Sequence, residues 1–206
     1  MTALELASKL REPFPDLISP PSEFRGEITV QLADAQKINE VCSFAKKNLG
    51  FDYLVDISSV DQYGDDPRFE VVYELYGMDH HCHLRLKTKV SEENASLPTV
   101  CTVWRTADWH EREIYDMMGI RFQNHPDLRR ILMWEGYPYF PLRKDFPLAG
   151  KPTDLPEVAF TKPAPLDGGP FVTTPGGKDS MVREPRVRLP EAEEKPLVTP
   201  QIGNHS

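Results

Sequence analysis

The sequence predicts an α+β fold: a mixed β-sheet of about four strands with helices packed on one face, followed by a long extended C-terminal arm. Alternating apolar and polar residues at 27–32, 69–76 and 81–90 are typical of half-buried strands. An apolar stripe at helical spacing marks residues 38–49. Past Gly150 no such period persists, and residues 151–206 hold ten of the chain's 20 prolines.

The first element along the chain is a predicted helix from Thr2 to Leu10. Thr2 and Glu5 have the spacing of a capping box, in which each side chain accepts a hydrogen bond from a backbone amide of the helix start. Pro13 and Pro15 prevent the helix from continuing. The alternating segment 27–32 then predicts a strand with one buried face.

The second helix is predicted over residues 38–49, after a capping Asp34. Gly50 stands where a left-handed residue ends a helix. Residues 51–57 predict the next strand. A strand, a helix and a strand with short connections imply a right-handed crossover, so strands 27–32 and 51–57 should be parallel if they share a sheet. The apolar stripe of the helix consists of Ile38, Val41, Cys42, Ala45 and Leu49.

Segments 69–76 and 81–90 predict a β-hairpin that turns near Gly77. Apolar residues occupy one face of both strands. The other face places acids on the first strand and bases on the second, so we expect cross-strand ion pairs of roughly 0.2–1 kcal/mol each. The residues of this polar face are Glu70, Glu74, His81, His83, Arg85 and Lys87.

A third helix is predicted over residues 108–118. Asp108 has the position of an N-cap, and Glu111 three residues later completes the spacing of a capping box. Arg112 and Asp116 are four residues apart, which predicts an ion pair on the helix surface. Gly119 follows as a left-handed C-terminal cap.

The change at Gly150 divides the chain into an α+β domain, residues 1–150, and a Pro-rich segment, residues 151–206. Alone, this segment has too few apolar residues to offset the entropy of ordering it. Extended at about 3.3 Å per residue, it could reach on the order of 180 Å. It is therefore either a disordered tail or an arm laid over a partner.

Composition excludes several classes of function. The formal net charge of −8 argues against a nucleic-acid surface. No run of 18 apolar residues exists that could span a membrane, and the N-terminus has no signal or transit features. The three cysteines include no C-x-x-C and give no framework for an iron–sulfur cluster. Neither G-x-G-x-x-G nor a P-loop occurs, so we expect the chain to bind no NADH.

Three motifs resemble chemical sites. The tract His80–His83 could ligate a metal, but strand alternation would put its side chains on two faces and beside Arg85, so a solvent-facing strand edge is the favoured interpretation. A zinc-protease helix starting at His110 would need a second histidine where Ile114 stands. For His125, capping of a turn that contains Pro126 is favoured over catalysis or quinone contact.

Residues 108–147 combine charges of both signs with large apolar side chains. A solvated loop needs fewer apolar groups, and a core has no room for so many guanidinium groups. Arginine and aromatic residues are enriched at interfaces, where charges can pair across subunits. This stretch therefore predicts a contact surface for other proteins.

The same stretch resembles a known family. The residues that carry the resemblance are Glu111-Arg112-Glu113, Tyr115-Asp116, Gly119-Ile120, Phe122, His125-Pro126-Asp127-Leu128-Arg129-Arg130-Ile131-Leu132 and Pro141-Leu142-Arg143-Lys144-Asp145-Phe146-Pro147-Leu148. They are similar to the signature of the C-type subunits, the 30-kDa subunit family, of respiratory complex I. The resemblance extends over most of residues 24–148.

The resemblance implies a non-catalytic structural subunit in the peripheral arm of a proton-pumping NADH–quinone oxidoreductase, on the cytoplasmic side of the bacterial inner membrane. The expected partners are chiefly the D-type (49-kDa) subunit, with the B-type and I-type subunits nearby, in a hetero-oligomer whose FMN and iron–sulfur clusters lie in partner subunits and not in this chain. It also favours an arm lying on partner subunits. The predicted interface residues are Glu111, Arg112, Glu113, Tyr115, Asp116, His125, Pro126, Asp127, Arg129, Arg130, Arg143, Lys144 and Asp145.

Two alternatives stay open from the sequence. One is the equivalent subunit of a membrane-bound hydrogenase or of a ferredoxin-driven relative. The other is a free-standing metalloprotein that uses His80–His83. For the favoured hypothesis, replacing Arg129 or Arg143 by Ala should weaken assembly, because losing one partner of a buried charge pair costs about 2–5 kcal/mol.

Overall fold

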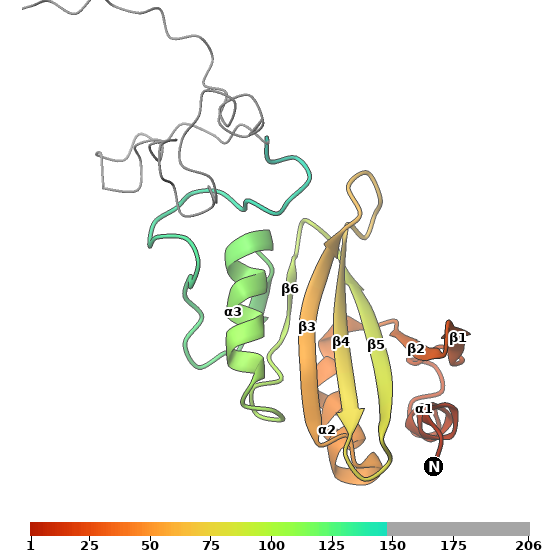
Figure 1. Ribbon diagram of the computed structural model, residues 1–206. Coiled ribbons are helices and arrows are strands. Elements are labelled where there is room, and N and C mark those ends of the chain that lie inside the picture. Colours follow the sequence, from red (N-terminus) through yellow and green to blue (C-terminus); the bar gives the residue numbers. More distant parts are fainter. Residues whose placement is uncertain (148–206) are drawn as a thin grey trace, which may run out of the picture. The chain divides into compact units, whose positions relative to one another are not determined.

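A mixed sheet of five strands, in the order β1-β2-β5-β4-β3, forms the centre of the computed structural model, which describes residues 1–147 (Figure 1). Strand β2 is parallel to β5, and the other neighbouring pairs are antiparallel. The predicted mixed sheet is confirmed, and so is the common direction of β2 and β3. The strands are β1 Ser22–Phe24, β2 Glu27–Leu32, β3 Tyr53–Asp61, β4 Phe69–Gly77 and β5 Cys82–Val90.

Three α-helices contribute to one core with the apolar face of the sheet. They are α1 Ala3–Arg11, α2 Ile38–Leu49 and α3 Ala107–Met118, with a short 3-10 helix η1 at Ala35–Lys37. A separate two-stranded parallel sheet pairs β6, Ser96–Pro98, with β7, Arg121–Gln123. The predicted α+β architecture with helices on one face is confirmed. The predicted arm, residues 151–206, lies outside the described residues.

The caps of the first two α-helices follow the sequence signals. The Thr2 side chain accepts a hydrogen bond from the Glu5 amide, and the Glu5 carboxylate accepts one from the Thr2 amide, so the capping box is confirmed. The Asp34 side chain caps η1, which leads directly into α2. All five residues of the predicted stripe of α2 are buried, and Gly50 ends the helix at φ +71°. Local signals therefore suffice for this part of the chain.

The outer face of the sheet carries the predicted ion pairs. Lys87 Nζ lies 3.0 Å from Glu70 Oε2, and Arg85 bonds both Glu74 and, at 2.7 Å, Glu27. The hairpin turns before β5 begins at Cys82, and His81 adopts φ +48° within the turn. Assigning His81 to a strand was therefore wrong, because the turn needs a residue with positive φ there. The strand predicted at 51–57 begins two residues later and is longer, as β3.

The predicted capping box of the third helix is wrong. Helix α3 begins at Ala107 after Thr106, and Asp108 lies inside the first turn. Glu111 faces inward and is fully buried, because it binds the preceding loop instead of the helix start. Gly119 ends the helix at φ +77°, as predicted. Among residues 1–147, no helix has the length and apolar character needed to cross a membrane.

Candidate functional site: the loop after α3

The chain leaves β7 as an irregular loop, residues 124–147, which we call the anchored loop (Figure 1). It contains no helix or strand in the part of the chain that the structure describes. Two groups of charged side chains attach it to α3 and to the sheet. All thirteen predicted interface residues lie on this loop or on α3.

The first anchor is the carboxylate of Asp116 on α3, which is fully buried. Its Oδ1 accepts a hydrogen bond of 2.6 Å from Arg130, and its Oδ2 accepts the consecutive amides of Ile131, Leu132 and Met133 at 3.0, 2.7 and 2.9 Å. Burial opposes ionisation, but these amides and the guanidinium outweigh it, so the pKa of Asp116 is lowered. The position of the loop backbone at residues 131–133 thus depends on the negative charge of Asp116.

The second anchor is Arg68, just before β4, whose side chain is 6% exposed. It donates two hydrogen bonds of 2.8 Å to Asp61, one of 2.7 Å to Glu92 and one of 2.8 Å to Asp145. Asp61 also accepts the Lys144 amide at 2.7 Å. The hydrogen bonds from Arg68 lower the pKa of both Asp61 and Asp145. The end of the loop is therefore joined to the sheet through the buried pair of Arg68 and Asp61.

Between the anchors the loop packs closely on the end of α3. Arg143 donates a 2.7 Å hydrogen bond to the Met118 carbonyl, and its guanidinium lies over the rings of Phe69 and Phe140. A Cβ on Gly119 would lie 2.7 Å from ring atoms of Phe140 and 2.8 Å from Arg143. Burial and the nearby Arg68 lower the pKa of Arg143. Glycine at 119 serves both the cap and this close contact.

The ion pair predicted between Arg112 and Asp116 is wrong. Asp116 uses its oxygens for Arg130 and the three loop amides, so none is left for Arg112. Arg112 donates instead to the Arg129 carbonyl at 3.3 Å and stacks over Trp109. The spacing suggested an ion pair on the helix surface, but both side chains are buried against the loop and bind loop residues instead.

The predicted interface residues differ in their exposure and in their partners. Four find charged partners inside the chain, at the two anchors or beside them: Asp116, Arg130, Arg143 and Asp145. Among residues 1–147, Arg129 forms an ion pair only with Asp127, and both side chains are more than half exposed, at 69% and 55%. Glu113, Pro126 and Lys144 are also exposed. Contact of any of them with another subunit stays a prediction.

Large apolar side chains accompany these exposed charges. Leu132 and Leu142 of the anchored loop are 62% and 57% exposed, and Trp109 of α3 is 61% exposed. Arg68 and Asp61, which hold this surface in place, were not predicted from the sequence. Their partners on the loop, Asp145 and Lys144, are 77 and 83 residues away along the chain, and no local sequence pattern predicts such pairing.

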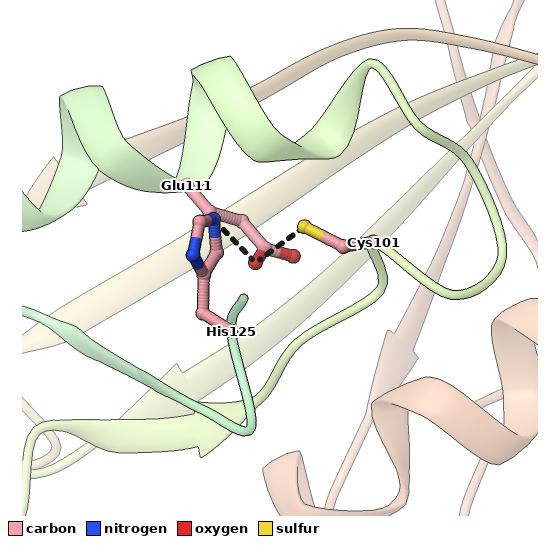
Figure 2. A group of neighbouring side chains, drawn as sticks. All are labelled: Cys101, Glu111 and His125. Carbon is pink, nitrogen blue, oxygen red and sulfur yellow. Dashed lines mark hydrogen bonds and ion pairs between the residues drawn. The ribbon is translucent and has the colours of Figure 1, made fainter. Parts of the chain in front are cut away.

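A second cluster lies buried beneath α3 (Figure 2). The Glu111 carboxylate accepts hydrogen bonds from the Thr99 hydroxyl at 2.5 Å, the Val100 amide at 2.7 Å and the Cys101 thiol at 3.5 Å. Burial raises the pKa of Glu111 to about 7, against the opposing effect of these donors. Burial also raises the pKa of Cys101 to about 12, so its thiol is protonated and unreactive.

His125 completes this cluster and caps a turn. Its Nδ1 accepts the Asp127 amide at 3.0 Å, so the prediction of a capping role is confirmed, although the residues form a turn and not a helix. Its Nε2 lies 3.9 Å from Glu111 Oε2 and 3.3 Å from Asp108 Oδ1. The side chain is fully buried, so in this chain it is closed to a quinone.

The ligand atoms of Cys101, Glu111 and His125 lie within 4.8 Å of one another, close enough to test as a metal site. A histidine that ligates a metal normally donates its other ring nitrogen to an acceptor. His125 does the opposite: its Nδ1 accepts an amide, so the neutral ring carries its proton on Nε2, the nitrogen that faces Glu111. The donor set favours a hydrogen-bonded structural cluster over a metal centre.

The other two motifs do not form sites. His80–His83 occupies the hairpin turn and the start of β5, and the part of the chain that the structure describes does not bring three of these residues to a common point. His110 pairs with Asp56 at 3.1 Å, and Ile114 is buried in the core.

Comparisons with known proteins agree with this geometry. Residues 31–152 match the family described as "Respiratory-chain NADH dehydrogenase, 30 Kd subunit". The C-type subunit of the NADH-quinone oxidoreductase of Geotalea uraniireducens is 49% identical over 142 residues, which cover 69% of this chain and 86% of that relative.

Two solved structures show the same fold. A trypsin-resistant fragment (1–134) of Nqo5 has a TM-score of 0.53 and 32% identity, and the match covers 62% of this chain and all of that chain. The membrane-bound sulfane sulfur reductase, an archaeal respiratory membrane complex, gives a TM-score of 0.60 at 23% identity, over 69% of this chain and 84% of that one, a likeness of fold alone. By its sequence match and its identity to curated relatives, the chain belongs to the family of the 30 kDa subunit of respiratory-chain NADH dehydrogenase, the C-type subunits of bacterial NADH-quinone oxidoreductase.

Proposed function

We propose that this chain is a non-catalytic structural subunit in the peripheral arm of a proton-pumping NADH–quinone oxidoreductase. It holds neighbouring subunits in register, while FMN and iron–sulfur clusters bound by other subunits pass electrons from NADH to quinone. Family membership supports the hetero-oligomer, since the relatives are named as subunits of that enzyme. Among residues 1–147, the donor set of the Glu111 cluster favours hydrogen bonding over metal binding, which supports the non-catalytic role.

The anchored loop is the observation that carries this proposal. An irregular loop with three large exposed apolar side chains in and beside it would be costly to order at the moment of binding. The Asp116 and Arg68 anchors remove that cost, because they fix the loop before any partner arrives. A preformed surface of this kind suits permanent assembly with neighbouring proteins.

The proposal extends to finer assignments, which the resemblance implies. The main partner is the D-type (49-kDa) subunit, with the B-type and I-type subunits nearby, on the cytoplasmic side of the bacterial inner membrane. The arm predicted at 151–206 adds further contact with those partners. A hydrogenase-type or ferredoxin-driven host is less supported, because the likeness to the sulfane sulfur reductase is one of fold, at 23% identity, whereas a relative at 49% is an NADH-quinone oxidoreductase subunit.

The test compares three Leu→Asp variants of the full chain, co-expressed with its operon partners and purified through a tag on the 49-kDa-type subunit. Leu132→Asp and Leu142→Asp place a charge on the anchored loop, whereas Leu4→Asp places one on α1, at a position that is 48% exposed. Circular dichroism of each isolated chain controls for folding.

We expect both loop variants to be retained at least tenfold less well than wild type, and Leu4→Asp to be retained normally, because a carboxylate in a dry interface is costly. Normal retention of both loop variants would contradict the proposed surface. Full assembly with lost NADH–quinone turnover would contradict the non-catalytic role.

A further inference from the structure

A hollow of about 160 Å³ runs between strand β3 and helix α3. Four consecutive residues, Asp56 to Ser59, line its strand side. Successive side chains of a strand point to opposite faces of the sheet, so a hollow that touches four in a row follows the edge of the strand and not one face. Strand β3 is the last strand of the sheet.

The outer edge of β3, beside which helix α3 packs, therefore has no partner strand among residues 1–147. In an edge strand, half of the backbone N–H and C=O groups point away from the neighbouring strand. Within residues 1–147, β3 pairs only with β4, and no other strand or loop covers its outer side with backbone hydrogen bonds. Tyr53 and Val60, at either end of the strand, are 45% and 44% exposed. Aromatic and β-branched residues are enriched in strands, so these exposed side chains suit a pleated surface.

The opposite wall of the hollow is apolar with an acidic rim. Helix α3 and the anchored loop supply its apolar side chains, Ile114, Met117, Met118 and Leu142. The Leu142 amide donates to the Met117 carbonyl at 3.2 Å, so the loop closes one end of this wall.

The charges of the rim have one sign. Among the residues that the structure describes, Asp56 on the strand side and Glu113 on the helix side are the only charged residues that line the hollow, and both are acidic. Asp56 has a single salt-bridge partner, His110, and Glu113 has none among residues 1–147. An occupant with positive charge and apolar side chains would satisfy both features.

We propose that this hollow receives an extended segment of a neighbouring subunit, which adds a strand to the sheet at the outer edge of β3. Its backbone pairs with the free groups of Asp56–Ser59. Alternate side chains are apolar and lie on the α3 wall, and a Lys or Arg faces Asp56 and Glu113. This inference rests on the proposed function, because it describes how this chain would bind one of the neighbouring subunits.

The experiment measures amide hydrogen exchange, resolved to single residues, in β3 of the purified complex and of the isolated full chain. The readout is the set of Asp56–Ser59 amides that point away from β4. We expect these amides to exchange at least about tenfold more slowly in the complex, and at a rate independent of concentration in the isolated chain.

Two charge-reversal variants sharpen the test. Glu113→Lys makes the rim of the hollow positive, whereas Glu93→Lys makes the same change at an exposed position outside the hollow. We expect Glu113→Lys to abolish most of the protection and Glu93→Lys to preserve it, in complexes that still contain the chain.

Each other outcome overturns the inference in a recognisable way. Unprotected amides in a normally assembled complex would refute strand addition and leave the structural role intact. Protection already present in the isolated chain would assign the edge to a second copy if it depends on concentration, or to the chain itself if it does not. A chain that never co-purifies with the other subunits would refute the proposed function as well.

Discussion

Replacing Asp116 by Asn removes one negative charge from the first anchor and leaves the side chain's size unchanged. The wild-type carboxylate holds Arg130 and three consecutive loop amides at 2.6–3.0 Å. The Asp116 side chain is fully buried and that of Arg130 is 12% exposed, so the change leaves a nearly buried guanidinium unpaired. Breaking such a pair costs about 3–5 kcal/mol.

The loss should appear first in the loop itself. At 1.4 kcal/mol per factor of ten, 3 kcal/mol corresponds to at least about 100-fold faster exchange of the amides of residues 131–133. Asp127→Asn is the matched control: it makes the same chemical change in the same loop, but its pair with Arg129 is 55% and 69% exposed. An exposed pair contributes about 0–1 kcal/mol, so the control should change exchange by less than about fivefold.

Amide exchange is followed by mass spectrometry at constant pH, and urea unfolding gives the global stability of each variant. If Asp116→Asn and Asp127→Asn change exchange at 131–133 equally, the loop is not held by a buried charge, and the anchoring role of Asp116 is refuted. Restoration of protection in the double variant Asp116→Asn/Arg130→Leu would show that the unpaired guanidinium, and not the missing acceptor, caused the loss.

Three further predictions concern stability. The pKa of Glu111 is raised from 4.5 to about 7, so between these pH values the folded state holds a proton that the unfolded state has lost. The free energy of unfolding should therefore fall by on the order of 3 kcal/mol as the pH rises through this window, as measured by urea unfolding at pH 5 and pH 8. The variant Glu111→Gln should show no such fall. Arg68→Met leaves the 2%-exposed Asp61 unpaired and should cost about 3–5 kcal/mol at neutral pH. Because the pKa of Asp61 is lowered, this difference should shrink as acid protonates Asp61, in unfolding curves measured from pH 7 down to about pH 2. Gly119→Ala should destabilise the folded chain by about 1–3 kcal/mol more than Gly136→Ala. Both glycines have positive φ, but of the two only a Cβ at 119 would contact neighbouring atoms. Equal melting temperatures of the two variants would contradict the close packing at Gly119.

Local patterns of residues were enough to predict most of the regular structure. The stripe of α2 and its Gly50 cap lie within one helix, and the alternation of the β4–β5 hairpin lies within two adjacent strands. Each of these features is decided by neighbours a few residues apart. Strand β1 was missed because its three residues are all exposed and show no alternation.

The candidate site was less predictable, because its partners are distant in sequence. Glu111 has the spacing of a capping residue, yet the Val100 amide and the Thr99 hydroxyl compete for it and win, since they lie in the core where an unpaired donor is costly. Asp116 likewise binds loop amides in preference to the nearby Arg112. Residue types identified the stretch 108–147 as special, but only the fold decides which charges face inward.

The second anchor also orders events during synthesis of the chain. Asp61 and Arg68 flank the β3–β4 connection, whereas Lys144 and Asp145 emerge from the ribosome some 80 residues later. The Lys144 amide and the Asp145 carboxylate can bind Asp61 and Arg68 together only after strands β3 and β4 have brought those two residues side by side. The anchored loop, and with it the surface that we propose for contact with other subunits, is therefore fixed only after this late segment has been made.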